Sequence, residues 1–118
     1  MRLNEIIELL AAEVIVNKDD TDVIAETACA SDLMSDVLSF AKPGGILLTG
    51  LTTIQVIYTA ELAELKAICF VRGKRPPKDT VRLAESKGVV LLRTNLPMFE
   101  SCGRLHEHGL KGCSHHDK

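Results

Sequence analysis

Short apolar runs alternate with amphipathic segments along the second half of the chain. The runs are residues 46–49, 67–71 and 89–92, and nearly all of their residues are apolar. This composition is typical of strands that are buried on both faces of a parallel sheet. Each is followed by a segment whose apolar residues have helical spacing; these predicted helices cover about residues 53–65, 78–87 and 96–108. Three successive strand–helix units with short loops predict parallel strands joined by right-handed crossovers.

The first half of the chain predicts one further helix and two further strands. A helix capped by Asn4 runs to Ala12, and Glu13–Val16 follows as a strand. Residues 17–20 predict a turn, and residues 23–30 predict the second strand. The fold class is therefore α/β, with three layers (α/β/α) around a mainly parallel sheet of about five strands.

Residues 31–50 predict a capped helix, an abrupt end and a buried strand. Ser31 is the expected N-cap, because its hydroxyl can accept a hydrogen bond from a free backbone N–H. Asp32 places negative charge at the positive end of the helix dipole. Pro43-Gly44-Gly45 cannot continue the helix, and the apolar run from Ile46 begins directly after it.

Composition excludes several classes of protein. The 118 residues suffice for one domain that folds without disulfides or metals. A net charge of -2 argues against a general nucleic-acid binder, and 3% aromatic residues argue against a base-stacking surface. We find neither a signal peptide nor an apolar run long enough to span a membrane, so we expect a cytoplasmic protein. Its four cysteines are then expected to be reduced. Cys29 and Cys69 lie in apolar runs and are expected to belong to the core.

The segment 30–38, Ala-Ser-Asp-Leu-Met-Ser-Asp-Val-Leu, resembles the signature VSDLLSDVM of DRTGG domains. Further matches follow in order at residues 41–44, 71–76, 88–94 and 99–105, so that the resemblance covers about residues 1–110. DRTGG domains are similar to the amino-terminal domain of HPr kinase/phosphorylase and to the accessory region of some phosphotransacetylases. The resemblance implies an α/β/α fold and a regulatory or ligand-sensing role without catalysis.

One position departs from the family pattern. The glycine pair that gives the family its name falls near Thr27-Ala28, where neither residue is glycine. Paired glycines allow a positive φ or a close approach of the backbone to a ligand. Any ligand contact that the pair makes in relatives is therefore expected to be lost or altered in this chain.

Polar and basic groups follow the predicted strands. In open α/β sheets ligands bind beyond the carboxyl ends of the strands, where helix N-termini favour anions and Arg binds phosphate or carboxylate bidentately. The predicted site for a small anionic ligand consists of Thr49, Gly50, Thr52, Thr53, Arg72, Lys74, Arg75, Arg93, Thr94 and Asn95, with Ser31 and Asp32. The alternative is that these loops are charged because water covers them, and that Thr and Asn serve as helix caps.

The carboxy-terminal end contains all four histidines of the chain. Cys102 and His106 share a face of the predicted helix, and Cys113 and His115 follow in the tail. Two thiolates and two imidazoles suit tetrahedral zinc, although this spacing is not a standard zinc motif. The alternative is a solvated tail with Cys102 packed in a close helix contact, and no other cofactor is expected.

The favoured function is a non-catalytic regulatory module that binds a small anionic metabolite or a nucleotide. The motifs GxxxxGK[ST] and GxGxxG are absent, and no segment supplies a nucleophile with its base, so we do not expect an enzyme. Two alternatives stay open: a protein-interaction subunit of a redox or metabolic enzyme system, and a metal-binding protein.

Residues 1–109 are expected to form the domain, and residues 110–118 are expected to form a flexible tail. By analogy with the family, the chain is expected to form a homodimer.

Overall fold

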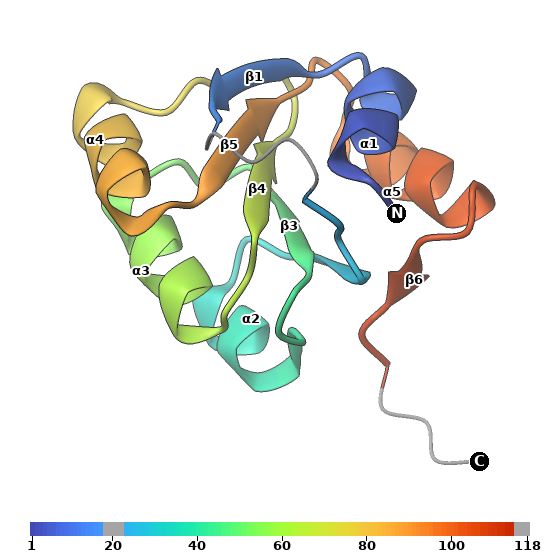
Figure 1. Ribbon diagram of the computed structural model, residues 1–118, viewed down its shortest axis with the longest axis horizontal. Helices are drawn as coiled ribbons and strands as arrows, with labels where there is room; N and C mark the ends of the chain where they lie inside the picture. The colour runs from blue at the N-terminus through green and yellow to red at the C-terminus, as the bar shows by residue number, and fades with distance from the viewer. Residues whose placement is uncertain (18–22, 115–118) are drawn as a thin grey trace.

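The computed structural model describes residues 1–17 and 23–114 of the chain. Within these residues, one sheet of six strands is flanked by five helices (Figure 1). The strands are β1 (Glu13–Val16), β2 (Thr27–Ala30), β3 (Ile46–Thr49), β4 (Ala67–Phe70), β5 (Val90–Arg93) and β6 (Lys111–Gly112). The helices are α1 (Leu3–Leu10), α2 (Met34–Phe40), α3 (Ile54–Leu62), α4 (Lys78–Lys87) and α5 (Met98–Glu107).

The strands lie in the order β1-β5-β4-β3-β2-β6. The five strands from β2 to β6 are parallel, whereas β1 pairs antiparallel with β5 at one edge. The mainly parallel sheet and the α/β class are thereby confirmed. Helices α2, α3 and α4 each connect two neighbouring parallel strands, so each carries the chain back to the same end of the sheet.

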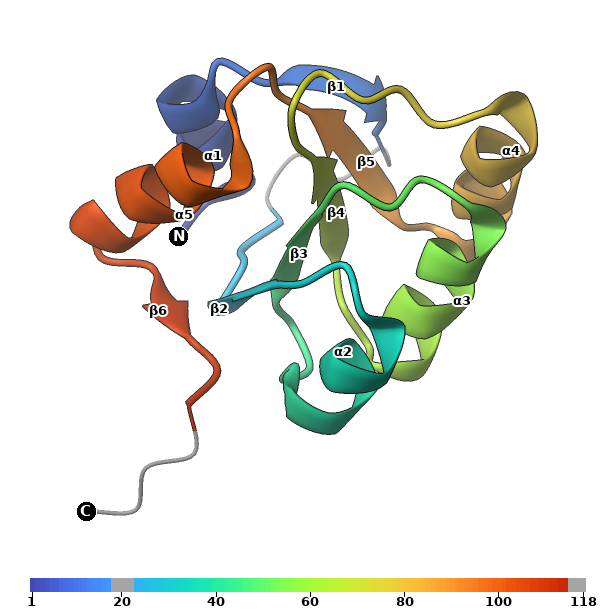
Figure 2. The ribbon, with the colours of Figure 1, turned by 180° about the vertical axis from the view of Figure 1, so that it is seen from behind.

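The two faces of the sheet carry different helices, because side chains alternate along each strand. In β4, Ile68 and Phe70 belong to the buried cluster that includes residues of α2, α3 and α4. Ala67 and Cys69 belong to the cluster that includes residues of α1 and α5. Figures 1 and 2 show these two helical layers on opposite sides of the sheet, which confirms the three-layer arrangement.

Two predicted segments differ from the structure in their extent. Of the predicted strand 23–30, only Thr27–Ala30 is a strand, and Ile24 forms an isolated bridge with Arg2. Residues 111–112, which the sequence places in a polar tail, instead form β6 and pair with Thr27 and Ala28. The short strand β6 covers the edge that β2 would otherwise leave open. The predicted turn at 17–20 lies mostly outside the described residues.

Helix boundaries follow the predictions more closely than helix caps do. Helix α4 spans the predicted residues, and Gly88 ends it with a φ of 72°, as a glycine in the left-handed region can. Asn4 is not a cap: Arg2 occupies the N-cap position of α1, and Asn4 lies inside the helix. No helix in the described part of the chain has the length and apolar character needed to cross a membrane.

Candidate functional site

The carboxyl ends of four parallel strands meet at one edge of the sheet. Thr49 of β3 pairs with Phe70 of β4, and Phe70 pairs with Arg93 of β5. Strand β2 lies on the other side of β3. We call the last residues of these strands and the loops after them the rim: it comprises residues 31–33, 49–53, 71–77 and 93–97. The parallel order therefore brings the sequence-predicted ligand residues to a single edge.

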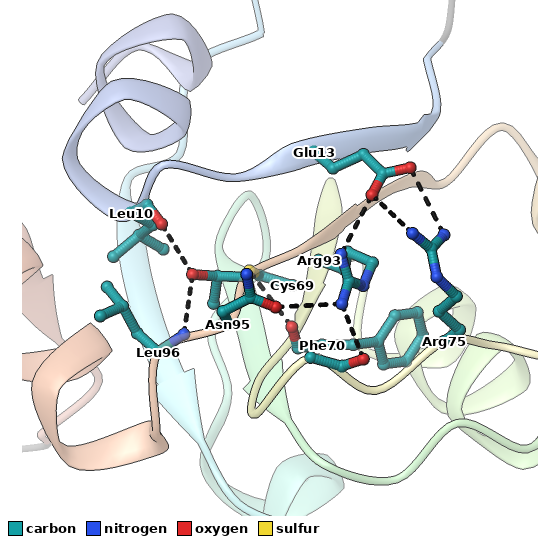
Figure 3. A network of polar contacts seen from close by, with 10 residues as sticks. Leu10, Glu13, Cys69, Phe70, Arg75, Arg93, Asn95 and Leu96 are labelled. Atoms are coloured by element: carbon teal, nitrogen blue, oxygen red, sulfur yellow. Dashed lines mark hydrogen bonds and ion pairs between the residues drawn. The ribbon is translucent and has the colours of Figure 1, made fainter.

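Two basic residues of the rim share one carboxylate, which comes from Glu13 of β1 (Figure 3). The Arg75 guanidinium donates to both Glu13 oxygens, at 3.1 and 3.4 Å. Arg93 Nη1 donates to Glu13 Oε1 at 3.1 Å. Glu13 meets Arg93 because the two are register partners in the β1–β5 pair. The protein therefore supplies its own anion to two of the predicted anion-binding cations.

Glu13 is the member of this network that the sequence analysis missed. Hydrogen bonds from Arg75 and then from Arg93 hold the pKa of the Glu13 carboxyl below its ordinary value of 4.5. The sequence places Glu13 at the start of a strand but does not say which strand it pairs with. Only the antiparallel position of β1 beside β5 brings this carboxylate to the rim.

Arg93 also connects two loops of the rim. Its Nη2 donates to the Gly73 carbonyl at 2.9 Å and to Asn95 Oδ1 at 3.1 Å. Asn95 is therefore a hydrogen-bond acceptor for Arg93, and the predicted capping role is wrong because Pro97 occupies the N-cap of α5. The Arg93 side chain is only 15% exposed. Its Nε is buried and finds no partner among the described residues.

The turn that follows β4 has an unusual backbone. Arg72 and Gly73 both have positive φ, at 60° and 70°, and their N–H groups donate to Leu96 and Thr94 carbonyls at 2.9 and 2.7 Å. A Cβ at position 73 would lie 3.0 Å from Asn95 Oδ1 and 3.1 Å from Arg93 Nη2, so a larger residue would be strained there. A non-glycine residue in the left-handed region, as at Arg72, stores strain that is common in functional loops.

Arg72 and Lys74 are the accessible cations of the rim. Both are exposed, and neither side chain has a hydrogen bond or ion pair within the part of the chain that the structure describes. Their charges are therefore available to an anion from solution, unlike those of Arg75 and Arg93.

Asp32 occupies the strand end of β3. Its Oδ1 accepts hydrogen bonds from Thr49 Oγ1 at 2.8 Å and from the Gly50 N–H at 2.7 Å. Ser31 does not cap α2 as predicted: Leu33 is the N-cap, and Ser31 Oγ accepts from the Leu33 N–H at 3.0 Å. This end of the rim thus carries a carboxylate where the sequence analysis expected an anion to bind.

The predicted threonines hold the loops in place. Thr94 Oγ1 is buried and donates to the Leu10 carbonyl at 2.6 Å, which attaches the loop after β5 to α1. The Thr52 carbonyl accepts from Thr80 Oγ1 at 2.8 Å. Thr53 is the N-cap residue of α3, without a side-chain hydrogen bond. Of these three residues, Thr94 is turned into the core, away from any ligand at the rim.

The predicted cysteine and histidine ligands lie in two different environments. Cys102 and His106 line an apolar cavity of about 110 Å³ between α5 and strands β2, β3 and β6. Cys113 lies beside Cys29, and His115 lies outside the described residues. Within residues 1–17 and 23–114, no group of three or more His, Cys, Asp or Glu side chains could hold a metal ion. The described residues do not form a zinc site, and zinc binding stays a prediction.

The position of the family glycine pair is far from the free cations. Thr27 and Ala28 begin β2 in extended backbone, and Ala28 lines the apolar cavity next to Cys102. The rim lies at the opposite end of β2, after Ala30. A non-glycine residue at these two positions therefore leaves the Arg72–Lys74 turn unaffected.

Comparison with known proteins bears on the fold and on the family. No curated protein matches this chain. Among solved structures, a match is the crystal structure of the CBS and DRTGG domains of the regulatory region of Clostridium perfringens pyrophosphatase, complexed with its activator diadenosine tetraphosphate. The TM-score is 0.74 at 16% sequence identity, which shows a shared fold. The alignment covers 88% of this chain but only 45% of the other.

A family model matches nearly the whole of the described domain. It is the model of the DRTGG domain, and it aligns with residues 5–108. The match includes all of the strands from β1 to β5 and the turn that carries Arg72 and Lys74. The chain therefore belongs to the DRTGG domain family.

Proposed function

We propose that this chain is a non-catalytic regulatory module that binds a small anionic metabolite, in particular a nucleotide with several phosphates, at the rim. The observation that carries the proposal is the positive-φ turn after β4, where Arg72 and Lys74 are exposed and without a partner among the described residues. This turn lies at the carboxyl ends of parallel strands, where ligands bind in open α/β sheets.

The charges around the turn favour an anion at one end of the rim only. Arg72, Lys74, Arg75 and Arg93 lie on the β4 and β5 side, where Glu13 balances part of their charge. On the β3 side the Asp32 carboxylate already accepts the Gly50 N–H. An anion is therefore attracted to the turn 71–75 and repelled from Gly50.

A polyphosphate suits this arrangement better than a single carboxylate does. Arg72 and Lys74 are two residues apart on a turn, and Arg75 becomes available where a ligand oxygen replaces Glu13. Several phosphoryl oxygens can satisfy several cations at once, and charge-assisted hydrogen bonds are the strong ones. The pyrophosphatase regulatory region, which shares this fold, is complexed with a dinucleoside tetraphosphate.

Titration calorimetry with diadenosine tetraphosphate, ATP and inorganic triphosphate tests the proposal. Arg72→Ala or Lys74→Ala should weaken binding about 10- to 100-fold, since each removes a hydrogen bond from a charged group. Lys66→Ala is the matched control, because Lys66 is an exposed cation at the other end of β4. Equal affinities in the Arg72 and Lys66 variants, or no binding of any of the three probes, would contradict the proposal.

Glu13→Gln separates competition from simple loss of charge. If Glu13 holds Arg75 and Arg93 in place of a ligand, the variant should bind the same probes more tightly. Added salt should weaken binding to all variants, because the cations at the turn are exposed. Weaker binding by the Glu13→Gln variant would instead show that the carboxylate orients the two arginines for the ligand.

The other predicted functions gain no support from the family match or from the solved relative. A protein-interaction role and the homodimer stay predictions, and light scattering after size-exclusion chromatography measures the assembly directly. The metal-binding alternative needs His115, which the structure does not describe, together with Cys102 and Cys113.

A further inference from the structure

The register of β2 and β6 makes two cysteines neighbours. Thr27 pairs with Lys111 and Ala28 pairs with Gly112, so the next residues along the chain are Cys29 in β2 and Cys113 directly after β6. Adjacent strands lie about 4.7–4.9 Å apart, which is inside the Cα–Cα range of roughly 4.4–6.8 Å found for disulfides. The Cys113 thiol is close enough to Cys29 to raise the pKa of the Cys29 thiol. Both cysteines are free and only partly buried.

We propose that Cys29 and Cys113 form a dithiol site that closes reversibly to an intrachain disulfide and thereby attaches β6 to β2. The pairing follows from the sheet register, which makes the two residues neighbours, and it joins residues that lie 84 positions apart in sequence (113 − 29). The proposal does not depend on a ligand at the rim.

The chemistry is a thiol–disulfide exchange with a small external disulfide such as oxidised glutathione. One protein thiolate attacks the external disulfide, releases one glutathione thiol and leaves a mixed disulfide on the protein. The second protein thiolate then attacks the protein sulfur of that mixed disulfide and releases the second glutathione thiol. The protein loses two electrons and two protons, and oxidised glutathione becomes two molecules of reduced glutathione.

The environment of Cys29 affects its reactivity. Burial raises the pKa of the Cys29 thiol, and the neighbouring Cys113 thiol adds to this rise. Either thiol can begin the exchange, and the other then resolves the mixed disulfide.

The other two cysteines are placed where they cannot take part in the same way. Cys69 in β4 is fully buried, and burial raises the pKa of its thiol to about 12. Cys102 lies on α5 and lines the apolar cavity with Ala28, on the other face of the sheet from Cys29. The dithiol site is therefore confined to the pair at the β2–β6 edge.

Closing the disulfide has a structural consequence for the cavity. Lys111 and Gly112 of β6 form part of its wall, and β6 is otherwise a two-residue strand at the edge of the sheet. A covalent link at Cys113 fixes this wall next to β2. Oxidation is thus expected to protect the residues around Gly112 from solvent and leave the Arg72–Lys74 turn unchanged, because that turn follows β4, and β3 lies between β4 and β2.

Peptide mapping of the full chain tests the proposal without any substitution. Trypsin cleavage after Lys and Arg separates all four cysteines, because they fall in residues 19–66, 67–72, 94–104 and 112–118. The reduced protein is equilibrated with oxidised and reduced glutathione, quenched in acid and alkylated. We expect a linked pair of peptides 19–66 and 112–118 that disappears on reduction.

Matched variants show whether the link is specific. Cys29→Ser and Cys113→Ser should each abolish it, whereas Cys102→Ser should leave it in place. The variant proteins are checked by circular dichroism, and the map of the unsubstituted chain decides the question if a variant does not fold. A link between peptides 94–104 and 112–118, or glutathione retained on Cys113 without any link, would overturn the proposal.

Discussion

At the scale of single residues, Glu13 determines how the rim presents its charge. One carboxylate contacts two guanidinium groups, and all three contacts lie between 3.1 and 3.4 Å. The side chain is nevertheless 48% exposed, so solvent screens the ion pairs and limits their contribution to stability. Glu13 holds the guanidinium groups of Arg75 and Arg93 next to each other.

The lowered pKa of Glu13 makes a small part of the stability depend on pH. Because the folded state holds the pKa below 4.5, the unfolded state binds more protons in acid. The stabilisation is present above pH 4.5 and is lost as the pH falls through the lower pKa of the folded state. Urea unfolding on both sides of pH 4.5 measures this effect. The free energy of unfolding should fall less on acidification for Glu13→Gln than for the parent chain.

The matched control for this pH effect is Glu85→Gln on the exposed surface of α4. The Glu85 side chain has no hydrogen bond or ion pair among the described residues. The free energy of unfolding of the Glu85→Gln variant should therefore depend on pH as that of the parent does. If the Glu13 and Glu85 variants lose stability equally in acid, the contacts from Arg75 and Arg93 do not stabilise the ionised carboxylate.

The roles of single polar residues were predicted less well than their positions. The basic residues of the rim follow directly from the ends of apolar runs, and the structure brings them to one edge. Ser31 and Asn95 were assigned as caps, but each accepts a hydrogen bond that depends on the loop around it. Short polar side chains can satisfy several nearby groups, so their type alone does not select the partner.

At the scale of elements, the central strands and their helices were the predictable part. Every residue of β3 and β4 is buried, and all but Thr49 are apolar, so this pattern is local to the sequence. Gly45 was predicted only as part of a stop signal, yet it also allows close packing. A Cβ there would lie 2.7 Å from Thr27 Oγ1 and 2.9 Å from the Thr27 carbonyl oxygen.

Two glycine substitutions should therefore have opposite effects on stability. Gly45→Ala should destabilise the fold by about 1–3 kcal/mol, because the added methyl group overlaps the backbone of β2. Gly103→Ala should stabilise it by roughly 0.5–1 kcal/mol, because Gly103 lies inside α5 with nothing within 4 Å of the added atom. Denaturant unfolding measures both, and a shift of the same sign in the two variants would contradict this account of Gly45.

At the scale of the whole molecule, the sheet order depends on contacts that no local pattern encodes. Strand β1 pairs with β5, and β6 pairs with β2, although many residues separate each pair in sequence. The prediction of about five strands missed β6 because two polar or small residues, Lys111 and Gly112, give no strand signal of their own. This segment is held in place instead by its pairing with the edge of β2 and by the burial of Leu110.

The same sheet order predicts a gradient of stability from the centre to the edges. Strand β4 lies between β3 and β5 with all of its residues buried, so exchange of its amide hydrogens requires nearly complete unfolding. Strand β1 has an irregular register between Val14 and Val16, and β6 has two exposed residues. Hydrogen exchange should be slowest in β4, faster in β1 and fastest in β6. Oxidation of Cys29 and Cys113 should slow exchange in β6 alone, since the link joins only β2 and β6. Amides of β6 that exchange as slowly as those of β4 in the reduced protein would show that this edge is already held by contacts other than the two-residue ladder.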